Sequence, residues 1–235
     1  MDFQDKRVLV LGGTSGIGLS VVQQLVSEGA KVQAASRNPA RANDLVDASV
    51  PLHAVDVRDE AAMENLFAEV GELNYLVCTA TGGERSVGPF LEMDIKGYKN
   101  SFDKLWGYAN AVRYGTQNLT ETGAIVLVSG APARRAKPGQ VSLASVGGAV
   151  EAFARTIAPE IAPRRINVVS PGLICTPMFG ETAEAQQETL ATPTAKHLIP
   201  RPGKAEEVAD AILFLLKNSF VTGTTVDVDG GWLLS

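Results

Sequence analysis

The stretch "VLVLGGTSGIGLSVVQQL", residues 8–25, decides the fold class. It has the pattern of a buried β-strand, a glycine-rich turn and a helix in immediate succession. Gly12, Gly16 and Gly18 have the spacing G-x-x-x-G-x-G, which suits a tight turn, close backbone approach to a pyrophosphate and a helix N-terminus facing negative charge. A tight turn without a ligand is the alternative. The position of the glycines between a strand and a helix favours dinucleotide binding.

The alternation of strand and helix continues to the end of the chain. Most strand-like runs are apolar on both faces, which is typical of a parallel sheet covered by helices on both sides. The runs predicted as strands are residues 7–12, 31–36, 51–57, 75–80, 124–130, 165–171 and 224–230. Apolar residues at spacings of three and four predict helices over residues 98–118 and 146–158. Residues 176–204 lack a clear period and predict a lid or substrate loop.

The composition is typical of one globular α/β domain, residues 1–235. Hydrophobic residues make up 45%, charged residues 20%, and the formal net charge is −5. Without a Lys/Arg run, such a chain is not expected to bind nucleic acid. We expect no membrane partner and a cytoplasmic location, because no apolar stretch approaches bilayer length and no signal segment precedes the first strand. We expect no metal site, since Cys78, Cys175, His53 and His197 lack ligand spacing.

The end of the second predicted strand bears on the choice of cofactor. Ser36 and Arg37 stand where a carboxylate would bind the ribose 2′-hydroxyl of NAD. Arginine offers a planar fork of donors to a phosphate, so we expect NADP(H) to be preferred over NAD(H). The alternative is that Arg37 is an exposed loop cation. Asp56 and Val57 end the third strand beside the expected adenine edge, although Asp56 could equally be the N-cap of a helix that begins near Glu60.

Four motifs, in this order, resemble those of the short-chain dehydrogenase/reductase family over nearly the whole chain. They are "LGGTSGIG" (11–18), "AVDVRD" (54–59), "SPGLICTPM" (170–178) and "PRPGKAEEVADAILFLLKNSFVTGTTVDVDGGW" (200–232), with Leu11 where the family usually has threonine. The resemblance implies a Rossmann-type, doubly wound parallel sheet of seven strands, an NADP(H)- or NAD(H)-dependent oxidoreductase, and a homotetramer or homodimer. It implies a cofactor site made of Gly12, Thr14, Ser15, Gly16, Ile17, Ser36, Arg37, Asp56, Val57, Ala80, Thr81, Pro171, Gly172, Ile174 and Thr176, with the last four near the nicotinamide.

The catalytic half of the chain departs from the family. The family's asparagine, serine, tyrosine and lysine align with Lys104, Gly130, Leu143 and Gly147, and its Asn-Asn-Ala-Gly segment with residues 78–81. In the family the tyrosine transfers the hydroxyl proton and the lysine lowers the pKa of that tyrosine. Leucine and glycine can do neither, while the hydride belongs to the nicotinamide. The usual proton route is therefore lost without loss of the redox agent.

Three functions remain open from the sequence. We favour an oxidoreductase with a relocated acid, for which Lys104 is the first candidate; the weaker candidates are Ser129, Ser142, Ser145 and Arg134. A substrate such as an activated alkene could instead take its second proton from water. The others are a silent NADP(H) sensor or scaffold, and a dehydratase or isomerase in the same pocket. Against the relocated acid, the Lys104 ammonium could extend to solvent from a helix surface.

The substrate is expected to be a small molecule of unknown identity. Residues 81–97 and 176–204 are predicted to shape its pocket. Gly147 and Gly148, adjacent in a predicted helix, indicate close approach of backbone to a neighbour, to a ligand or to a second subunit. Trp106 and Tyr108 could serve either a subunit contact or the pocket.

Overall fold

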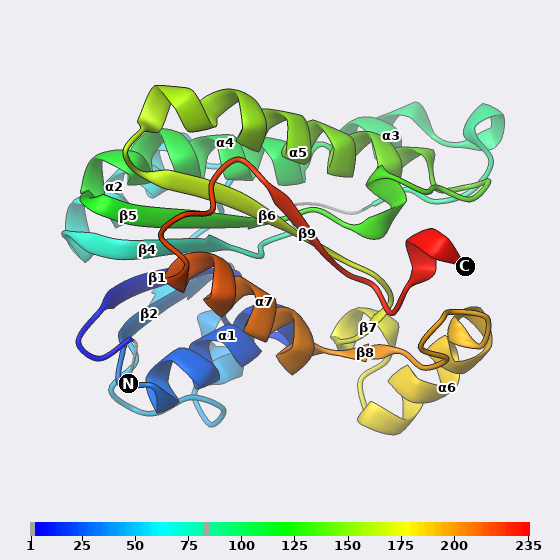
Figure 1. Ribbon diagram of the computed structural model, residues 1–235, viewed down its shortest axis with the longest axis horizontal. Helices are drawn as coiled ribbons and strands as arrows, with labels where there is room; N and C mark the ends of the chain where they lie inside the picture. Colours follow the sequence, from blue (N-terminus) through cyan, green and yellow to red (C-terminus); the bar gives the residue numbers. More distant parts are fainter. Residues whose placement is uncertain (1–2, 82–84) are drawn as a thin grey trace.

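The computed structural model describes residues 3–81 and 85–235 and contains a seven-stranded parallel sheet (Figure 1). The strand order is β3-β2-β1-β4-β5-β6-β9, and every neighbouring pair is parallel. The strands are β1 (Arg7–Leu11), β2 (Lys31–Ser36), β3 (Leu52–Ala54), β4 (Leu73–Cys78), β5 (Leu119–Val128), β6 (Arg165–Pro171) and β9 (Thr225–Val228). The order reverses direction between β1 and β4, which is where ligands bind in doubly wound sheets. The predicted fold class, a doubly wound parallel sheet of seven strands, is confirmed. Of the residues predicted to shape the substrate pocket, 82–84 lie outside the described residues.

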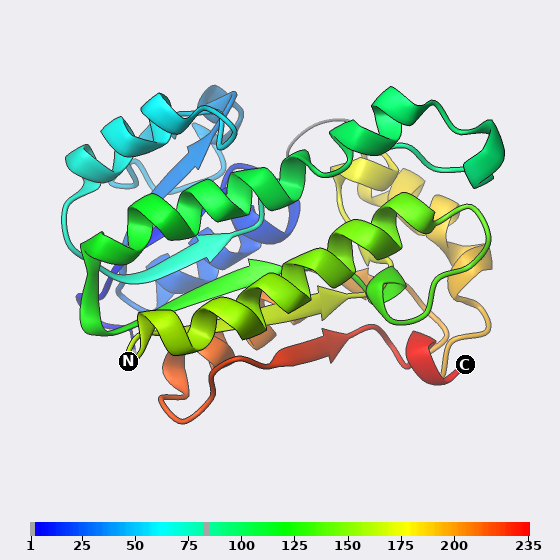
Figure 2. The same cartoon turned by 90° about the horizontal axis from the view of Figure 1, so that it is seen from above.

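Helices cover both faces of the sheet (Figures 1 and 2). The described residues form seven α-helices: α1 (Gly16–Ser27), α2 (Glu60–Val70), α3 (Ile95–Asn100), α4 (Asp103–Gly115), α5 (Val141–Ile161), α6 (Ala183–Thr194) and α7 (Ala205–Lys217). Helices α2, α4 and α5 pack on one face, and α1 and α7 on the other. Alternate residues of β1 serve the two cores: Leu9 and Leu11 face α2 and α4, whereas Val8 and Val10 face α1 and α7. This explains why the strand is apolar on both faces.

The helix predicted over residues 98–118 is two helices, α3 and α4, with a break at Ser101 and Phe102. Asp94 caps the start of α3 by accepting from the amides of Lys96 and Gly97. The buried Ser101 hydroxyl donates to the Gly97 carbonyl oxygen at 3.0 Å and accepts from the Ser86 amide at 3.2 Å. A serine side chain that bonds to backbone in this way competes with helix continuation.

The segment predicted as a lid loop, residues 176–204, contains helix α6. Thr182 caps α6 by accepting from the Ala185 amide, and only two of its residues, Leu190 and Thr194, are buried. Few buried positions leave little apolar periodicity, which is why the sequence predicted no helix here. A short parallel pair, β7 (Ile174–Cys175) and β8 (Gly203–Lys204), ties the two ends of the segment together.

Helix α5 corrects the expectation that no apolar segment reaches bilayer length. This helix of 21 residues is long enough and apolar enough to cross a membrane, judged by length and composition only, and its mean hydropathy is 1.2. However, Val150 and Ala154 are buried in the core against the sheet, and the helix also carries Glu151 and Arg155. The packing accounts for α5 as a core helix of the α/β domain.

Candidate active site

The glycine-rich turn joins β1 to α1 in the conformation that the sequence predicted. Gly12 has a φ of +86° and Gly16 a φ of +50°, in the left-handed region that glycine adopts readily. A Cβ on Gly18 would lie 2.2 Å from the Gly12 carbonyl oxygen, so only glycine allows the turn and the helix to approach this closely. The Ser15 side chain at the start of α1 does not cap the helix. The first-turn amides of α1 therefore remain available to an anion.

A cleft of about 490 Å³ lies over this turn at the carboxyl ends of β1, β2 and β4. Twelve of the fifteen predicted cofactor residues line it: Gly12, Thr14, Ser15, Gly16, Ile17, Ser36, Arg37, Asp56, Val57, Ala80, Thr81 and Thr176. The other three, Pro171, Gly172 and Ile174, line an adjoining cavity together with Thr176. The structure thus brings all fifteen residues to one continuous site.

The β2 end of this cleft is cationic. Arg37 and Arg41 are both exposed and both line it. The Thr14 hydroxyl donates to the Ser36 hydroxyl oxygen at 2.8 Å, which joins the glycine-rich turn to the end of β2. Sequence reasoning missed Arg41. The available signal was a second arginine in the same loop, four residues after Arg37.

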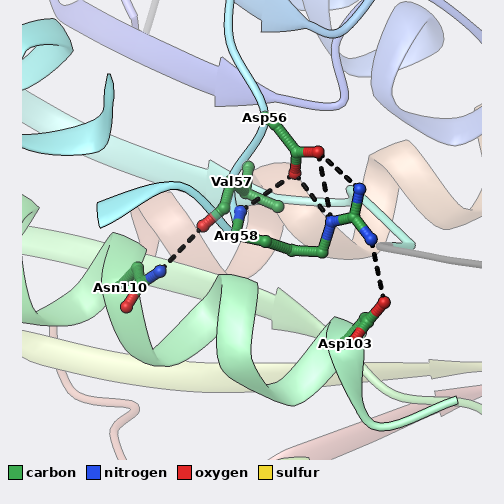
Figure 3. Close-up of polar contacts among 5 residues, drawn as sticks. All are labelled: Asp56, Val57, Arg58, Asp103 and Asn110. Atoms are coloured by element: carbon green, nitrogen blue, oxygen red, sulfur yellow. Dashed lines mark hydrogen bonds and ion pairs between the residues drawn. The ribbon is translucent and has the colours of Figure 1, made fainter. Parts of the chain in front are cut away.

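A polar network fixes the end of β3 against helix α4 (Figure 3). The Arg58 guanidinium donates to Asp56, with Nε 2.9 Å from Oδ1, and also to Asp103, with Nη1 2.9 Å from Oδ2. These hydrogen bonds from Arg58 lower the pKa of the Asp56 carboxyl. The Asn110 side-chain amide donates to the Val57 carbonyl oxygen at 3.0 Å. Two residues of the first cleft are therefore held by the helix that carries Lys104.

The alternative role of Asp56 as a helix cap is wrong. Asp59 caps α2, because its side chain accepts from the Ala62 amide at 3.0 Å. Helix α4 closely approaches the segment that follows β3, because it has a glycine at the contact: a Cβ on Gly107 would lie 2.5 Å from Val57 Cγ2.

The adjoining second cavity has a volume of about 600 Å³ and lies at the carboxyl ends of β5 and β6. It shares Ile17, Thr79, Thr81, Thr176 and Met178 with the first cleft. All three proposed catalytic residues, Lys104, Ser129 and Ser142, line it. The four residues that the resemblance implies near the nicotinamide, Pro171, Gly172, Ile174 and Thr176, also line this cavity.

Lys104 is buried, with an exposed fraction of 6%, so the alternative that it extends to solvent is wrong. Its Nζ donates to the Ser129 carbonyl oxygen at 2.9 Å and lies 5.7 Å from the centre of the Tyr108 ring. Burial, aided by the charge of Arg85, lowers the pKa of Lys104 to about 7. Arg85 also lines the cavity; it belongs to the segment 81–97 that was predicted to shape the pocket, but no pattern singled it out within that segment. Lys104 can therefore hold or release a proton near neutral pH.

The two serine candidates already donate their hydroxyl protons to protein acceptors. The Ser129 hydroxyl donates to Glu151 Oε1 at 3.0 Å, and the Ser142 hydroxyl donates to the Ser86 carbonyl oxygen. Glu151 is buried and also accepts from Arg134 Nε at 3.3 Å. Among the three candidates, Lys104 has N–H groups left over after its single hydrogen bond, since an ammonium carries three.

Known proteins resemble this chain along its whole length. The enoyl-(acyl carrier protein) reductase family profile matches residues 12–233. The short-chain dehydrogenase/reductase ATR9 of Stachybotrys chlorohalonatus is 33% identical over 97% of each chain. The chain belongs to the short-chain dehydrogenase/reductase family. The L-xylulose reductase of Bos taurus is 34% identical over 97% of this chain and 96% of that protein. The crystal structure of a small-chain dehydrogenase in complex with NADPH superposes with a TM-score of 0.86, at 34% identity over 99% and 100% of the two chains.

As a member of the short-chain dehydrogenase/reductase family, with relatives named dehydrogenases and reductases, the chain is an oxidoreductase. The sequence predicts that Gly147 and Leu143 stand at the positions of the family's lysine and tyrosine. A Cβ on Gly147 would lie 2.9 Å from the Ala133 Cβ, so a lysine at that position does not fit without a backbone shift. Leu143 lines the second cavity.

None of the four tyrosines, all within the described residues, lines the second cavity. Tyr108 is buried beneath it, and its hydroxyl donates to the Val128 carbonyl oxygen at 3.3 Å. Tyr108 is therefore a core residue, neither a subunit contact nor a pocket residue, whereas Trp106 is 60% exposed.

Proposed function

We propose that this chain is an NADP(H)-dependent oxidoreductase in which Lys104 transfers the proton that accompanies hydride transfer. The proposal rests on the position of Lys104, which is buried and lines the second cavity. Its ammonium makes one hydrogen bond, to the Ser129 carbonyl oxygen, and its other N–H groups can bind a substrate. In a cavity lined by no tyrosine, Lys104 replaces the usual acid.

The residues around the first cleft fit a dinucleotide that carries a 2′-phosphate. Its β2 end presents Arg37 and Arg41, and Ser36 stands where a carboxylate would repel the phosphate. The solved small-chain dehydrogenase in complex with NADPH supports the same choice. We therefore propose that NADP(H) is preferred over NAD(H).

The dinucleotide supplies the hydride to the substrate when it is bound. Reduction of a carbonyl also needs one proton at the carbonyl oxygen, and the Lys104 ammonium is the donor. Lys104 becomes a neutral amine in this step and regains a proton from water. Its pKa of about 7 suits it to both states near neutral pH. In the direction of oxidation the neutral amine accepts the hydroxyl proton.

The test begins with binding and then measures turnover. NADPH and NADH are titrated by fluorescence, and NADPH oxidation is followed with a panel of carbonyls, quinones and activated alkenes. Lys104→Met is expected to lower kcat by about 10²–10⁴-fold while NADPH binding is retained. Lys99→Met, which changes an exposed lysine on α3, is the matched control and should leave kcat unchanged.

The pH profile separates proton transfer by Lys104 from a structural role. Wild-type kcat for reduction is expected to fall as the pH rises above about 7, because Lys104 then loses its proton. Unchanged kcat in Lys104→Met would place the proton source elsewhere. Tight NADPH binding without oxidation of NADPH by any substrate in the panel would favour a sensor.

We further propose that the protein is a cytoplasmic homodimer or homotetramer. Trp106 is an apolar side chain that α4 leaves exposed, and Phe153 and Ile157 on the neighbouring helix α5 are only partly buried. Cys78 and Cys175 are free thiols. Light scattering of the wild type and of Trp106→Glu tests the assembly, and a monomeric wild type would contradict it.

A further inference from the structure

The second cavity is positively charged at one end and apolar elsewhere. Lys104 and Arg85 both line it, and no aspartate or glutamate is among the described residues in its wall. Much of the remaining wall is apolar, including Leu143, Val146 and Trp232. Two cations in a cavity without a counter-charge are electrostatically unfavourable until an anion enters.

Arg85 differs from the other partly buried arginines in how its guanidinium is satisfied. Arg165 donates to three backbone carbonyl oxygens, and Arg134 pairs with Glu151 and Asp227. Within residues 3–81 and 85–235, no hydrogen bond or ion pair is formed by the Arg85 guanidinium. Burial lowers the pKa of Arg85, which reflects the cost of holding its charge away from water. Arg85 is partly exposed, so its unused N–H groups are accessible to a ligand in the cavity.

We infer that the second cavity selects substrates that carry a carboxylate, with the carboxylate bound by Arg85 and the reacting oxygen directed to Lys104. The guanidinium fork matches the two oxygens of a carboxylate in a bidentate pair. A cavity of about 600 Å³ with an apolar wall takes, in addition, a carbon skeleton of moderate size. A phosphate dianion fits less well, because Arg85 supplies a single positive charge once Lys104 faces the reacting oxygen. The inference rests on the proposed function, in that Lys104 is taken as the group that faces the reacting oxygen.

The test is ligand binding to the protein saturated with NADP⁺, a state in which no substrate can be reduced. Cinnamate, phenylpyruvate and 4-phenylbutanoate are titrated by calorimetry against their neutral amides. Each carboxylate is expected to bind about 10- to 100-fold more tightly than its amide, as for a charged hydrogen-bonded pair. In Arg85→Gln the ratio should fall to about one, and Arg85→Lys should retain part of it. Arg113→Gln, on the exposed face of α4, is the matched control and should leave the ratio unchanged.

Several results would overturn the inference. One is that no carboxylate binds the wild type more tightly than its amide, and another is that Arg85→Gln keeps the full ratio. A fall in NADP⁺ affinity of Arg85→Gln as large as its loss of carboxylate binding would assign Arg85 to the cofactor instead. The two proposals fail separately. Lys104-dependent turnover confined to neutral substrates overturns only this inference, whereas tight carboxylate binding without any NADPH oxidation overturns only the proposed function.

Discussion

Replacing Lys104 by methionine removes a buried charge while keeping an unbranched side chain of similar length. The pKa of Lys104 falls from 10.5 to about 7 on folding. Between these pH values the unfolded chain binds one proton more than the folded protein, so wild-type stability rises with pH by about 1.4 kcal/mol per unit. This contribution is fully present above pH 10.5 and is lost as the pH falls to 7. Over the whole interval it amounts to about 5 kcal/mol.

The methionine variant lacks this pH dependence, but it also leaves the Ser129 carbonyl oxygen without the Lys104 hydrogen bond. That loss is expected to cost about 1–3 kcal/mol. Below pH 7 the variant should therefore be more stable than the wild type by about 2–4 kcal/mol. Since the wild type gains about 1.4 kcal/mol per pH unit, the difference should disappear near pH 9.

Urea unfolding of both proteins between pH 6 and pH 9, extrapolated to water, gives the two free energies of unfolding. Subtracting the free energy of unfolding of Lys104→Met from that of the wild type at each pH isolates the contribution of Lys104, because the other titrating groups are common to both proteins. Lys99→Met should show no such pH-dependent difference, because Lys99 is exposed on α3. A difference between wild type and Lys104→Met that stays constant across this range would refute the buried, low-pKa lysine.

Three further predictions test the site around Lys104. Arg37→Ala should raise the Kd for NADPH by about 10- to 100-fold and leave that for NADH nearly unchanged, as measured by fluorescence titration. Gly107→Ala places a Cβ 2.5 Å from Val57 Cγ2, so urea unfolding should show a loss of about 1–3 kcal/mol. Ser129→Ala removes the hydrogen bond to Glu151 and should lower stability by about 1–3 kcal/mol. Its kcat should fall less than about tenfold, and a fall of about 10²-fold or more would identify Ser129 as the proton donor.

Much of the cofactor site followed from local sequence. The glycine-rich turn needs residues that tolerate positive φ and close backbone approach, and Gly12, Gly16 and Gly18 carry that requirement themselves. Polar residues at the ends of consecutive parallel strands meet at one edge of the sheet, which is why Arg37 and Asp56 could be assigned to one cleft in advance. The break between α3 and α4 could not be predicted, because it depends on the hydrogen bonds of the Ser101 side chain. Helix α6 could not be predicted either, because it buries only two residues.

The sequence by itself therefore determined the alternation of strands and helices and the glycine-rich turn, and it predicted that leucine and glycine replace the family's tyrosine and lysine. Only the tertiary structure decided that Lys104 is buried, that the Ser129 and Ser142 hydroxyls are engaged, and that Arg85 is the residue of segment 81–97 that brings a second cation to the cavity. The physical reason is the distance along the chain over which each property is determined. Backbone conformation and apolar periodicity are set by neighbours along the chain, whereas burial, charge and hydrogen-bond partners are set by segments that only folding brings together.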